Sequence, residues 1–210
     1  MQIKVKGLLL SKKLINENNL FVKILTEKDE ILTGIVYAGN SSKKKFIYQI
    51  GYFLNINCTI KNTNIPNIIT ADITSPYILD TFNDKFKMNC LIAIISIINL
   101  SIIEGQKIDN IYLISDNFIT SLINKKKWIV YFCNYLFSLL KVIGYEIDYK
   151  KNKKYQYFNI KKLEFTQNND NNCIDFPHKF ISNEKRIDFK SINNIFIIFE
   201  EVFINNHLIN

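Results

Sequence analysis

The residues of this sequence that could do chemistry are mainly lysines gathered in one short stretch. Residues 39–45 read Gly-Asn-Ser-Ser-Lys-Lys-Lys, and Tyr48 and Gln49 follow closely. Glycine and serine let a backbone approach phosphates, lysine adds charge without sequence preference, and an aromatic ring offers a face on which an unpaired base can stack. The stretch therefore predicts a groove for single-stranded nucleic acid. The alternative is a solvated loop in a lysine-rich protein.

Other lysines extend this prediction. The predicted nucleic-acid site consists of Lys12, Lys13, Lys23, Lys43, Lys44, Lys45 and Tyr48. A second basic cluster, Lys125, Lys126 and Lys127, precedes a predicted helix, where cations oppose the helix dipole by about 0.3–1 kcal/mol. That cost is small enough to be accidental, but an anionic partner would also explain it, and we rank the cluster as the second candidate site.

Enzyme motifs are missing from the sequence. It contains no nucleotide-binding glycine loop, no G-x-S-x-G and no H-E-x-x-H. The thiol and imidazole side chains are scattered, without a C-x-x-C pair: Cys58, Cys90, Cys133, Cys173, His178 and His207. We therefore expect a protein that is not an enzyme, with no metal, no cofactor and no small-molecule substrate.

The composition agrees with a polyanionic partner but does not require one. The formal net charge is +8 and the pI about 9.2, yet Arg186 is the only arginine, and a genome rich in AT codons would favour lysine anyway. The first six residues alternate rather than forming an apolar leader, and the longest uncharged stretch, residues 88–103, is shorter than the about 20 residues of a membrane span. We expect a cytoplasmic protein that does not enter a membrane.

Two types of element must position these residues. The first 75 residues alternate in short strands at about 3–10, 20–25, 31–37, 52–61 and 68–74, with a long insertion between the third and fourth. Five strands so arranged predict an OB-fold β-barrel. After Ser75-Pro76, apolar residues recur every three to four positions and predict helices at about 80–98, 109–123, 128–143 and 191–205. The predicted class is α+β, with an OB domain at 1–77 and a helical domain at 78–210 that is irregular at about 150–190.

Two stretches are similar to the RecO family of bacterial repair proteins. The segment 7–51 carries a Gly-Leu-Leu-Leu strand, the turn Asn16-Glu17-Asn18-Asn19, a hairpin, the basic glycine loop and Gln49-Ile50-Gly51, in the order of the RecO opening. Residues 137–148 end in Ile-Gly-Tyr-Glu-Ile-Asp, which resembles the family's L-G-[YF]-x-[LI]-D helix end. The two matches bracket most of the first 148 residues.

The sequence also departs from the family. Many relatives place the cysteines of a zinc-binding insertion after the second stretch, whereas here Tyr149, Lys150 and Lys151 follow and only Cys173 lies downstream. We therefore expect no zinc insertion. The basic loop carries lysines where relatives often have arginines, so point charges replace bidentate phosphate contacts.

The resemblance implies a non-catalytic protein of recombinational repair in the RecFOR pathway. Such a protein binds single- and double-stranded DNA, anneals complementary strands, contacts RecR and the single-strand-binding protein, and helps RecA to load. It would act in the bacterial cytoplasm, associated with the nucleoid. Two alternatives stay open: an OB-fold RNA-binding or ribosome-associated factor that uses the same lysines, and a protein–protein adaptor whose apolar helical surface is the binding site.

Overall fold

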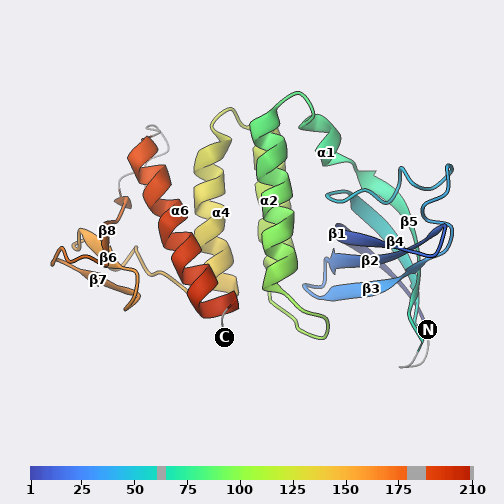
Figure 1. Cartoon of the computed structure of the whole chain (residues 1–210), viewed down its shortest axis with the longest axis horizontal. Helices are drawn as coiled ribbons and strands as arrows, with labels where there is room; N and C mark the ends of the chain where they lie inside the picture. The colour runs from blue at the N-terminus through green and yellow to red at the C-terminus, as the bar shows by residue number, and fades with distance from the viewer. Residues whose placement is uncertain (61–64, 179–187, 209–210) are drawn as a thin grey trace. The chain divides into compact units, whose positions relative to one another are not determined.

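The N-terminal strands form a closed barrel in the computed structural model, which describes residues 1–60, 65–178 and 188–208. The strands are β1 (Gln2–Ile15), β2 (Asn19–Thr26), β3 (Ile31–Val36), β4 (Phe53–Thr59) and β5 (Ile68–Ser75). They close in the order β1-β2-β3-β5-β4 (Figure 1). Every neighbouring pair is antiparallel except β3 and β5, which meet in parallel at Ile35 and Ile68.

Alternation along the strands builds the barrel interior. The inward residues form one buried cluster with two tyrosines from the insertion between β3 and β4: Val5, Leu9, Leu20, Val22, Ile24, Val36, Tyr48, Tyr52, Leu54, Ile56, Cys58, Ile69 and Ala71. Gly7 allows β1 to bend tightly across β2, because a Cβ at this position would lie 2.5 Å from the Ile24 Cγ2. The insertion therefore does more than connect two strands, since it supplies part of the core.

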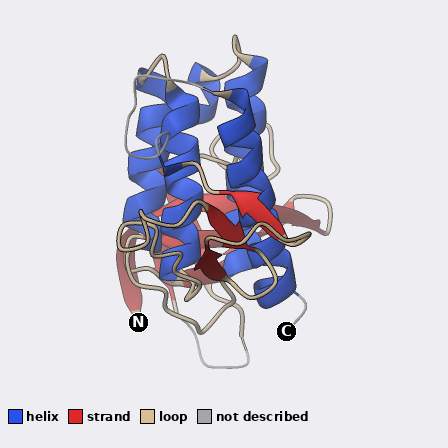
Figure 2. Cartoon of the chain, turned by 90° about the vertical axis from the view of Figure 1, so that its left-hand side faces the viewer, coloured by secondary structure: helices blue, strands red, loops and turns tan. Residues whose placement is uncertain are grey.

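Helices make up most of the remaining chain (Figure 2). They are α1 (Tyr77–Asp80), α2 (Lys85–Ser101), α3 (Ile111–Asn124), α4 (Trp128–Val142) and α6 (Phe189–Phe203), with a π-helical turn at Ile204–Leu208. The prediction of an α+β protein with an N-terminal five-stranded sheet and C-terminal helices is confirmed. No helix among the described residues is long and apolar enough to cross a membrane.

A small second sheet lies where the sequence suggested irregular chain. Strands β6 (Tyr157–Asn159), β7 (Glu164–Thr166) and β8 (Cys173–Asp175) pair in the order β7-β6-β8. Each strand has only three residues, which is too short for alternation to show in the sequence. Three phenylalanines pack together on this sheet, with Phe165 ring centroids 5.1 Å from Phe158 and 4.9 Å from Phe176.

The chain divides into two compact units, Met1–Ile123 and Asn124–Asn210. The first holds the barrel with α2 and most of α3, because side chains of the β2–β3 hairpin bind the ends of both helices. The Lys23 Nζ donates to the Asn99 and Ile102 carbonyls at 2.9 and 3.0 Å, and the Asp29 carboxylate accepts the Asn110 and Tyr112 N–H groups at 2.8 and 3.0 Å. Packing thus divides the chain after residue 123, whereas the predicted domains meet at 77/78.

Candidate nucleic-acid interface

The lysine loop is a folded structure rather than an extended strand connection. Between β3 and β4 the backbone makes successive turns, in which the Lys44 and Lys45 N–H groups donate to the Ser41 carbonyl at 3.0 and 2.9 Å. The Asn40 N–H donates to the Asn18 carbonyl at 2.9 Å, which ties the loop to the β1–β2 turn. Lys43 and Lys45 are exposed, and the Lys44 Nζ reaches the Tyr37 carbonyl at 3.3 Å. The loop therefore presents its lysines from a fixed backbone.

Two predicted contact residues hold this loop from inside. The Lys12 Nζ donates to the Tyr48 carbonyl at 2.7 Å and to the Gln49 Oε1 at 3.0 Å, and its partial burial lowers the pKa of Lys12. Tyr48 is only 2% exposed, and its hydroxyl accepts the Ala71 N–H at 3.0 Å. Stacking of a base on Tyr48 is therefore wrong as a prediction, because the ring lies in the barrel core. Lys12 and Tyr48 position the loop instead.

The remaining predicted lysines separate in space. Lys23 binds the end of α2, and burial lowers its pKa against the opposing influence of Glu104. Its ammonium is therefore committed to helix carbonyls rather than exposed as a phosphate contact. Lys13 follows Lys12 on β1 and is exposed, because successive side chains of a strand point to opposite faces. Of the seven predicted residues, Lys13, Lys43, Lys44 and Lys45 keep a placement suited to phosphate contacts.

The second basic cluster lies in the other unit. Lys125, Lys126 and Lys127 are exposed, and Lys127 occupies the N-cap position of α4 without a capping hydrogen bond from its side chain. This placement agrees with the predicted helix start. The cluster stays a second candidate for an anionic partner, and its three lysines match the loop in number.

The structure adds aromatic and basic residues that were not singled out from the sequence. Phe46 and Tyr37 are 56% and 52% exposed, and they flank the lysine loop in sequence. Proteins that bind single strands combine exposed aromatic rings with nearby lysines in this way. The sequence order Lys45-Phe46-Ile47-Tyr48 could have indicated Phe46, because it directly follows the lysines. Phe46 is the exposed ring, and Tyr48, two residues later, is the buried one.

A polar strip on the outer barrel was also missed. Lys4 and Lys6 of β1 are exposed opposite Asn57 and Asn55 of β4. They line two neighbouring hollows of about 470 and 260 Å³ that share Lys4 and Asn57. The sequence could have indicated this strip, because the polar residues Gln2, Lys4 and Lys6 alternate along β1. The strip gives the barrel a second surface with the amide and ammonium donors that nucleic-acid backbones accept.

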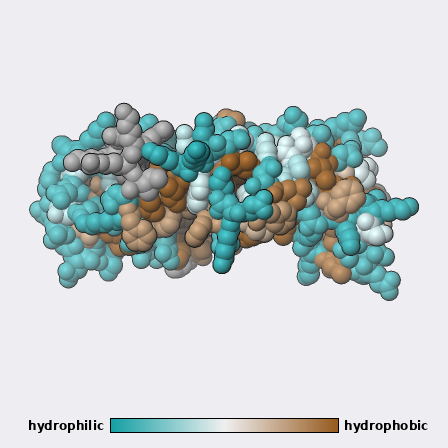
Figure 3. Space-filling view, turned by 90° about the horizontal axis from the view of Figure 1, so that it is seen from above, coloured by the Kyte–Doolittle hydropathy of each residue, from teal (hydrophilic) through white to brown (hydrophobic). Residues whose placement is uncertain are grey.

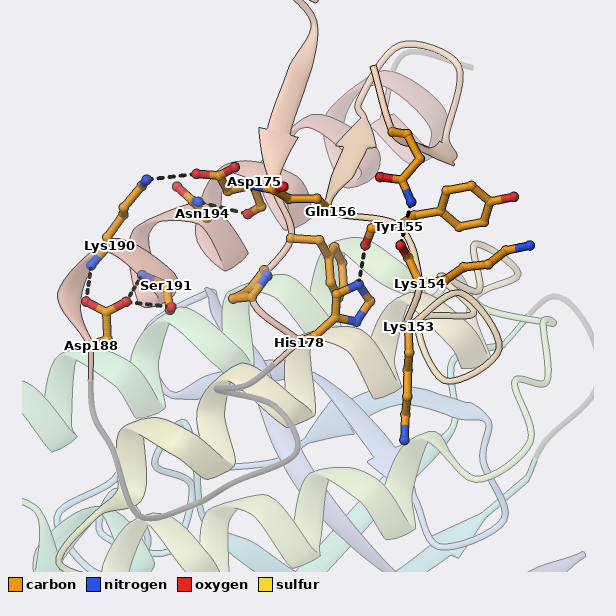
Figure 4. Close-up of a pocket in the computed structure, with 13 residues that line it drawn as sticks. Lys153, Lys154, Tyr155, Gln156, Asp175, His178, Asp188, Lys190, Ser191 and Asn194 are labelled. Carbon is orange, nitrogen blue, oxygen red and sulfur yellow. Dashed lines mark hydrogen bonds and ion pairs between the residues drawn. The ribbon is translucent and has the colours of Figure 1, made fainter. Parts of the chain in front are cut away.

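A larger cavity in the second unit brings together side chains of types that occur in active sites. With a volume of about 640 Å³, it gathers His178 with Asp175 and Asp188, and this is a combination that could support acid–base chemistry (Figure 4). The hydrogen bonds assign the three groups to structure, however. The His178 Nε2 lies 2.9 Å from the Tyr155 carbonyl, Asp175 pairs with the Lys190 Nζ at 2.8 Å, and Asp188 caps α6.

The Cys133 side chain, on α4, is likewise part of a core. It is fully buried, and burial raises the pKa of the Cys133 thiol to about 12. A thiol with such a pKa is protonated at neutral pH and is a poor nucleophile. The side chain therefore serves packing of the helix.

Comparison with known proteins agrees with the family resemblance. The chain is similar to DNA repair protein RecO of Rickettsia canadensis, with 27% identity over 151 residues, and of Rickettsia bellii, with 28% over 152 residues. It is also 27% identical to the RecO protein of Rickettsia akari over 151 residues. No family model matches the chain. The resemblance to RecO is thus confirmed by curated homologues.

These matches cover a limited share of the relatives. Each spans 72% of this chain, but only 62% of the R. canadensis and R. bellii proteins and 63% of the R. akari protein. The matched region is therefore less than two thirds of the length of these curated relatives.

Proposed function

We propose that this chain, a homologue of the RecO proteins, is a DNA repair protein whose N-terminal barrel is an OB fold that binds DNA. The strand order β1-β2-β3-β5-β4, closed by one parallel pair, supports the OB assignment. The observation that carries the proposal is the lysine loop, in which the exposed Lys43 and Lys45 extend from a backbone held by Lys12 and Tyr48. A fixed basic loop binds phosphates with a smaller conformational entropy cost than a mobile loop.

Annealing of complementary strands follows from such a surface without covalent catalysis. Lys43, Lys44 and Lys45 screen phosphate charge, while Phe46 and Tyr37 stack on unpaired bases. Phosphate contacts carry no sequence information, so any two complementary strands are suitable substrates. The polar strip around Lys4 and Lys6 offers a second backbone-binding surface on the same barrel. We propose that the chain binds both single- and double-stranded DNA in this way.

The partners follow from the family rather than from the contacts. We propose that the chain works with RecR and the single-strand-binding protein to help RecA loading, in a bacterial cytoplasm and near the nucleoid. Exposed hydrophobic side chains favour a role in protein binding as well. Phe82 and Phe86 are 58% and 76% exposed, and hydrophobic patches interrupt the hydrophilic face in Figure 3. A protein–protein adaptor is therefore the second candidate function.

A salt series on two matched variants tests the DNA-binding proposal. Replacing Lys43, Lys44 and Lys45 by alanine should weaken binding of fluorescent single-stranded DNA. It should also lower the slope of log affinity against log salt by about 2, at roughly 0.7 for each phosphate that is no longer neutralised. The control replaces Lys125, Lys126 and Lys127 by alanine, which removes the same charge from the other basic cluster. Strand annealing should fall in parallel with binding in the loop variant.

Other results would point to other functions. An unchanged salt slope in the loop variant, with a reduced slope in the control variant, would move the DNA site to the start of α4. A clear preference for RNA of matched sequence would favour the RNA-binding alternative. Absence of any nucleic-acid binding would leave the adaptor.

A further inference from the structure

Two turns of the small sheet bring the side chains of Asn159, Asp170 and Cys173 together, next to the backbone N–H of Lys162. Asn159 ends β6 and Cys173 begins β8, and their Cα atoms are paired across the two strands. The turn after β6 contains Lys162, and the loop before β8 contains Asp170. The Ile160 N–H donates to the Asn172 carbonyl at 3.0 Å, which joins the two turns directly. The four residues come in two pairs, 159/162 and 170/173, each with two residues between its members.

This spacing is that of a structural zinc site. Paired ligands separated by two residues, from two facing turns, form the tetrahedral site of many zinc-stabilised small domains. Here the Asn159 Nδ2 lies 3.3 Å from the Asp170 Oδ2 and 3.7 Å from the Cys173 Sγ. The question is therefore whether the four side chains fit a metal.

The orientation of the Asn159 amide decides against a metal. Its Oδ1 accepts the N–H groups of Lys161 and Lys162 at 3.1 and 2.9 Å, so the NH₂ group must face Asp170 and Cys173. An NH₂ group has hydrogens and no available lone pair to offer a cation. Lys162 brings a positive charge rather than a ligand. Only Asp170 and Cys173 could coordinate, and among the described residues no group of three or more His, Cys, Asp or Glu could hold a metal ion.

We propose that Asn159, Asp170 and Cys173 form a hydrogen-bonded knuckle that holds the two turns in place of a metal ion. Asn159 is the centre of this knuckle: it is 3% exposed and its amide bonds both turns at once. Lys162 contributes its backbone N–H to the knuckle, while its Nζ lies 3.7 Å from the Glu164 Oε1. The aromatic cluster of Phe158, Phe165 and Phe176 supplies the apolar core beneath it.

The electrostatics of Asp170 agree with the knuckle. Hydrogen bonds from the Asn172 N–H and from the Cys173 thiol lower the pKa of Asp170, with smaller contributions from Lys162 and Asn159. The carboxylate is therefore ionised at neutral pH and remains an acceptor for its neighbours.

Metal content and chelation test the proposal in the whole 210-residue chain. Purified wild-type protein should contain far less than one zinc per chain by mass spectrometry, and a chelator should leave its melting temperature unchanged. Asn159→Ala should lower the melting of the second unit by roughly 5–15 °C, because two backbone N–H groups lose their acceptor. Asn159→Asp keeps that acceptor but places a second carboxylate oxygen toward Asp170, so it should also destabilise at neutral pH. Lys150→Ala, at an exposed lysine of the same unit, is the control.

A second experiment tests whether positions 159, 162, 170 and 173 lie close enough together to bind one metal ion. The triple variant Asn159→Cys, Lys162→Cys, Asp170→Cys joins native Cys173 to form four thiolates. It should bind one cobalt ion with the absorption of a tetrahedral thiolate site, and its melting temperature should become sensitive to chelators. Stoichiometric zinc in the wild type with loss of structure on chelation would overturn the proposal. So would an Asn159→Ala variant as stable as the control, or a folded triple variant that binds no cobalt.

Discussion

At the scale of single residues, neighbouring aromatic side chains of the lysine loop have opposite roles. Tyr48 is buried and hydrogen-bonded to the backbone of β5, whereas Phe46 is exposed. Judged by residue type alone, Tyr48 is more suitable than Phe46 as a surface contact for an unpaired base, since its hydroxyl can face water. The structure excludes this contact, because the Tyr48 ring is buried and its hydroxyl accepts a backbone N–H inside the barrel. A contact role for the loop therefore depends on Phe46 and Tyr37.

Phe46→Ala should weaken binding of single-stranded DNA by about 1–3 kcal/mol per stacked base. Its thermal stability should stay close to that of the wild type, because the ring is 56% exposed. Fluorescence anisotropy with a labelled oligonucleotide measures the affinity. Phe82→Ala is the matched control, since it removes a similarly exposed ring outside the loop. Equal affinity of the two variants would count against base stacking on Phe46.

Tyr48→Phe should lower the stability of the protein and leave its DNA affinity unchanged. Removal of the hydroxyl leaves the Ala71 N–H without its acceptor in the barrel core, at a cost of about 1–3 kcal/mol in the free energy of unfolding. DNA affinity of the folded protein should be unchanged. Denaturant unfolding measures the first quantity and anisotropy the second. Tyr37→Phe, at an exposed tyrosine, should change the stability by much less.

At the scale of elements, the β2–β3 hairpin connects the barrel to two helices. Lys23 places an ammonium at the C-terminal carbonyls of α2, and Asp29 places a carboxylate at the first N–H groups of α3. Each charge has the sign that the helix dipole favours at that end. The hairpin thus satisfies backbone groups that would otherwise lack partners, and it fixes where α2 ends and α3 begins.

Asp29→Ala should destabilise the first unit by about 0.5–2 kcal/mol, as the removal of a helix N-cap does. Hydrogen exchange should increase most at the start of α3, because the Asn110 and Tyr112 N–H groups lose their acceptor. Mass-spectrometric exchange resolves this region from the barrel. Glu17→Ala makes the same charge change in the exposed β1–β2 turn. Identical exchange in the two variants would show that Asp29 does not cap the helix.

At the scale of the whole molecule, the barrel depends on helices that follow it in sequence. Leu8 and Phe53 are buried although neither belongs to the interior cluster of the barrel. The Phe53 ring meets Tyr112 of α3 edge-on, with ring centroids 6.0 Å apart. A barrel without α2 and α3 would therefore expose apolar surface and lose the partners of Lys23 and Asp29.

Two fragments distinguish the unit boundary from the predicted domain boundary. Residues 1–123 should fold alone, with a cooperative melting transition and dispersed NMR amide signals. Residues 1–77 should be much less stable or aggregate, because Leu8 and Phe53 lose their cover. Circular dichroism and NMR on both fragments measure this difference. A stable, well-dispersed 1–77 fragment would support the predicted OB domain as an independent folding unit.

The sequence alone determined the order and type of the longer elements. Alternation marked the five barrel strands, and three-to-four-residue spacing marked α2, α3, α4 and α6 within a few residues. The lysine loop was also readable, because clustered charge is a property of adjacent residues. Both the spacing of apolar residues and the clustering of charge are local properties, so they can be recognised without knowledge of the fold.

Which lysines and aromatic residues of that region are available to a ligand depends on contacts between distant parts of the chain. Lys23 meets carbonyls 76 and 79 residues away, and Lys12 meets a loop 36 residues away. Asn159 likewise bonds Asp170 and Cys173 across two turns. These partners are brought together by strand pairing and helix packing. The exposure of a side chain depends on such distant contacts, and no local pattern encodes them.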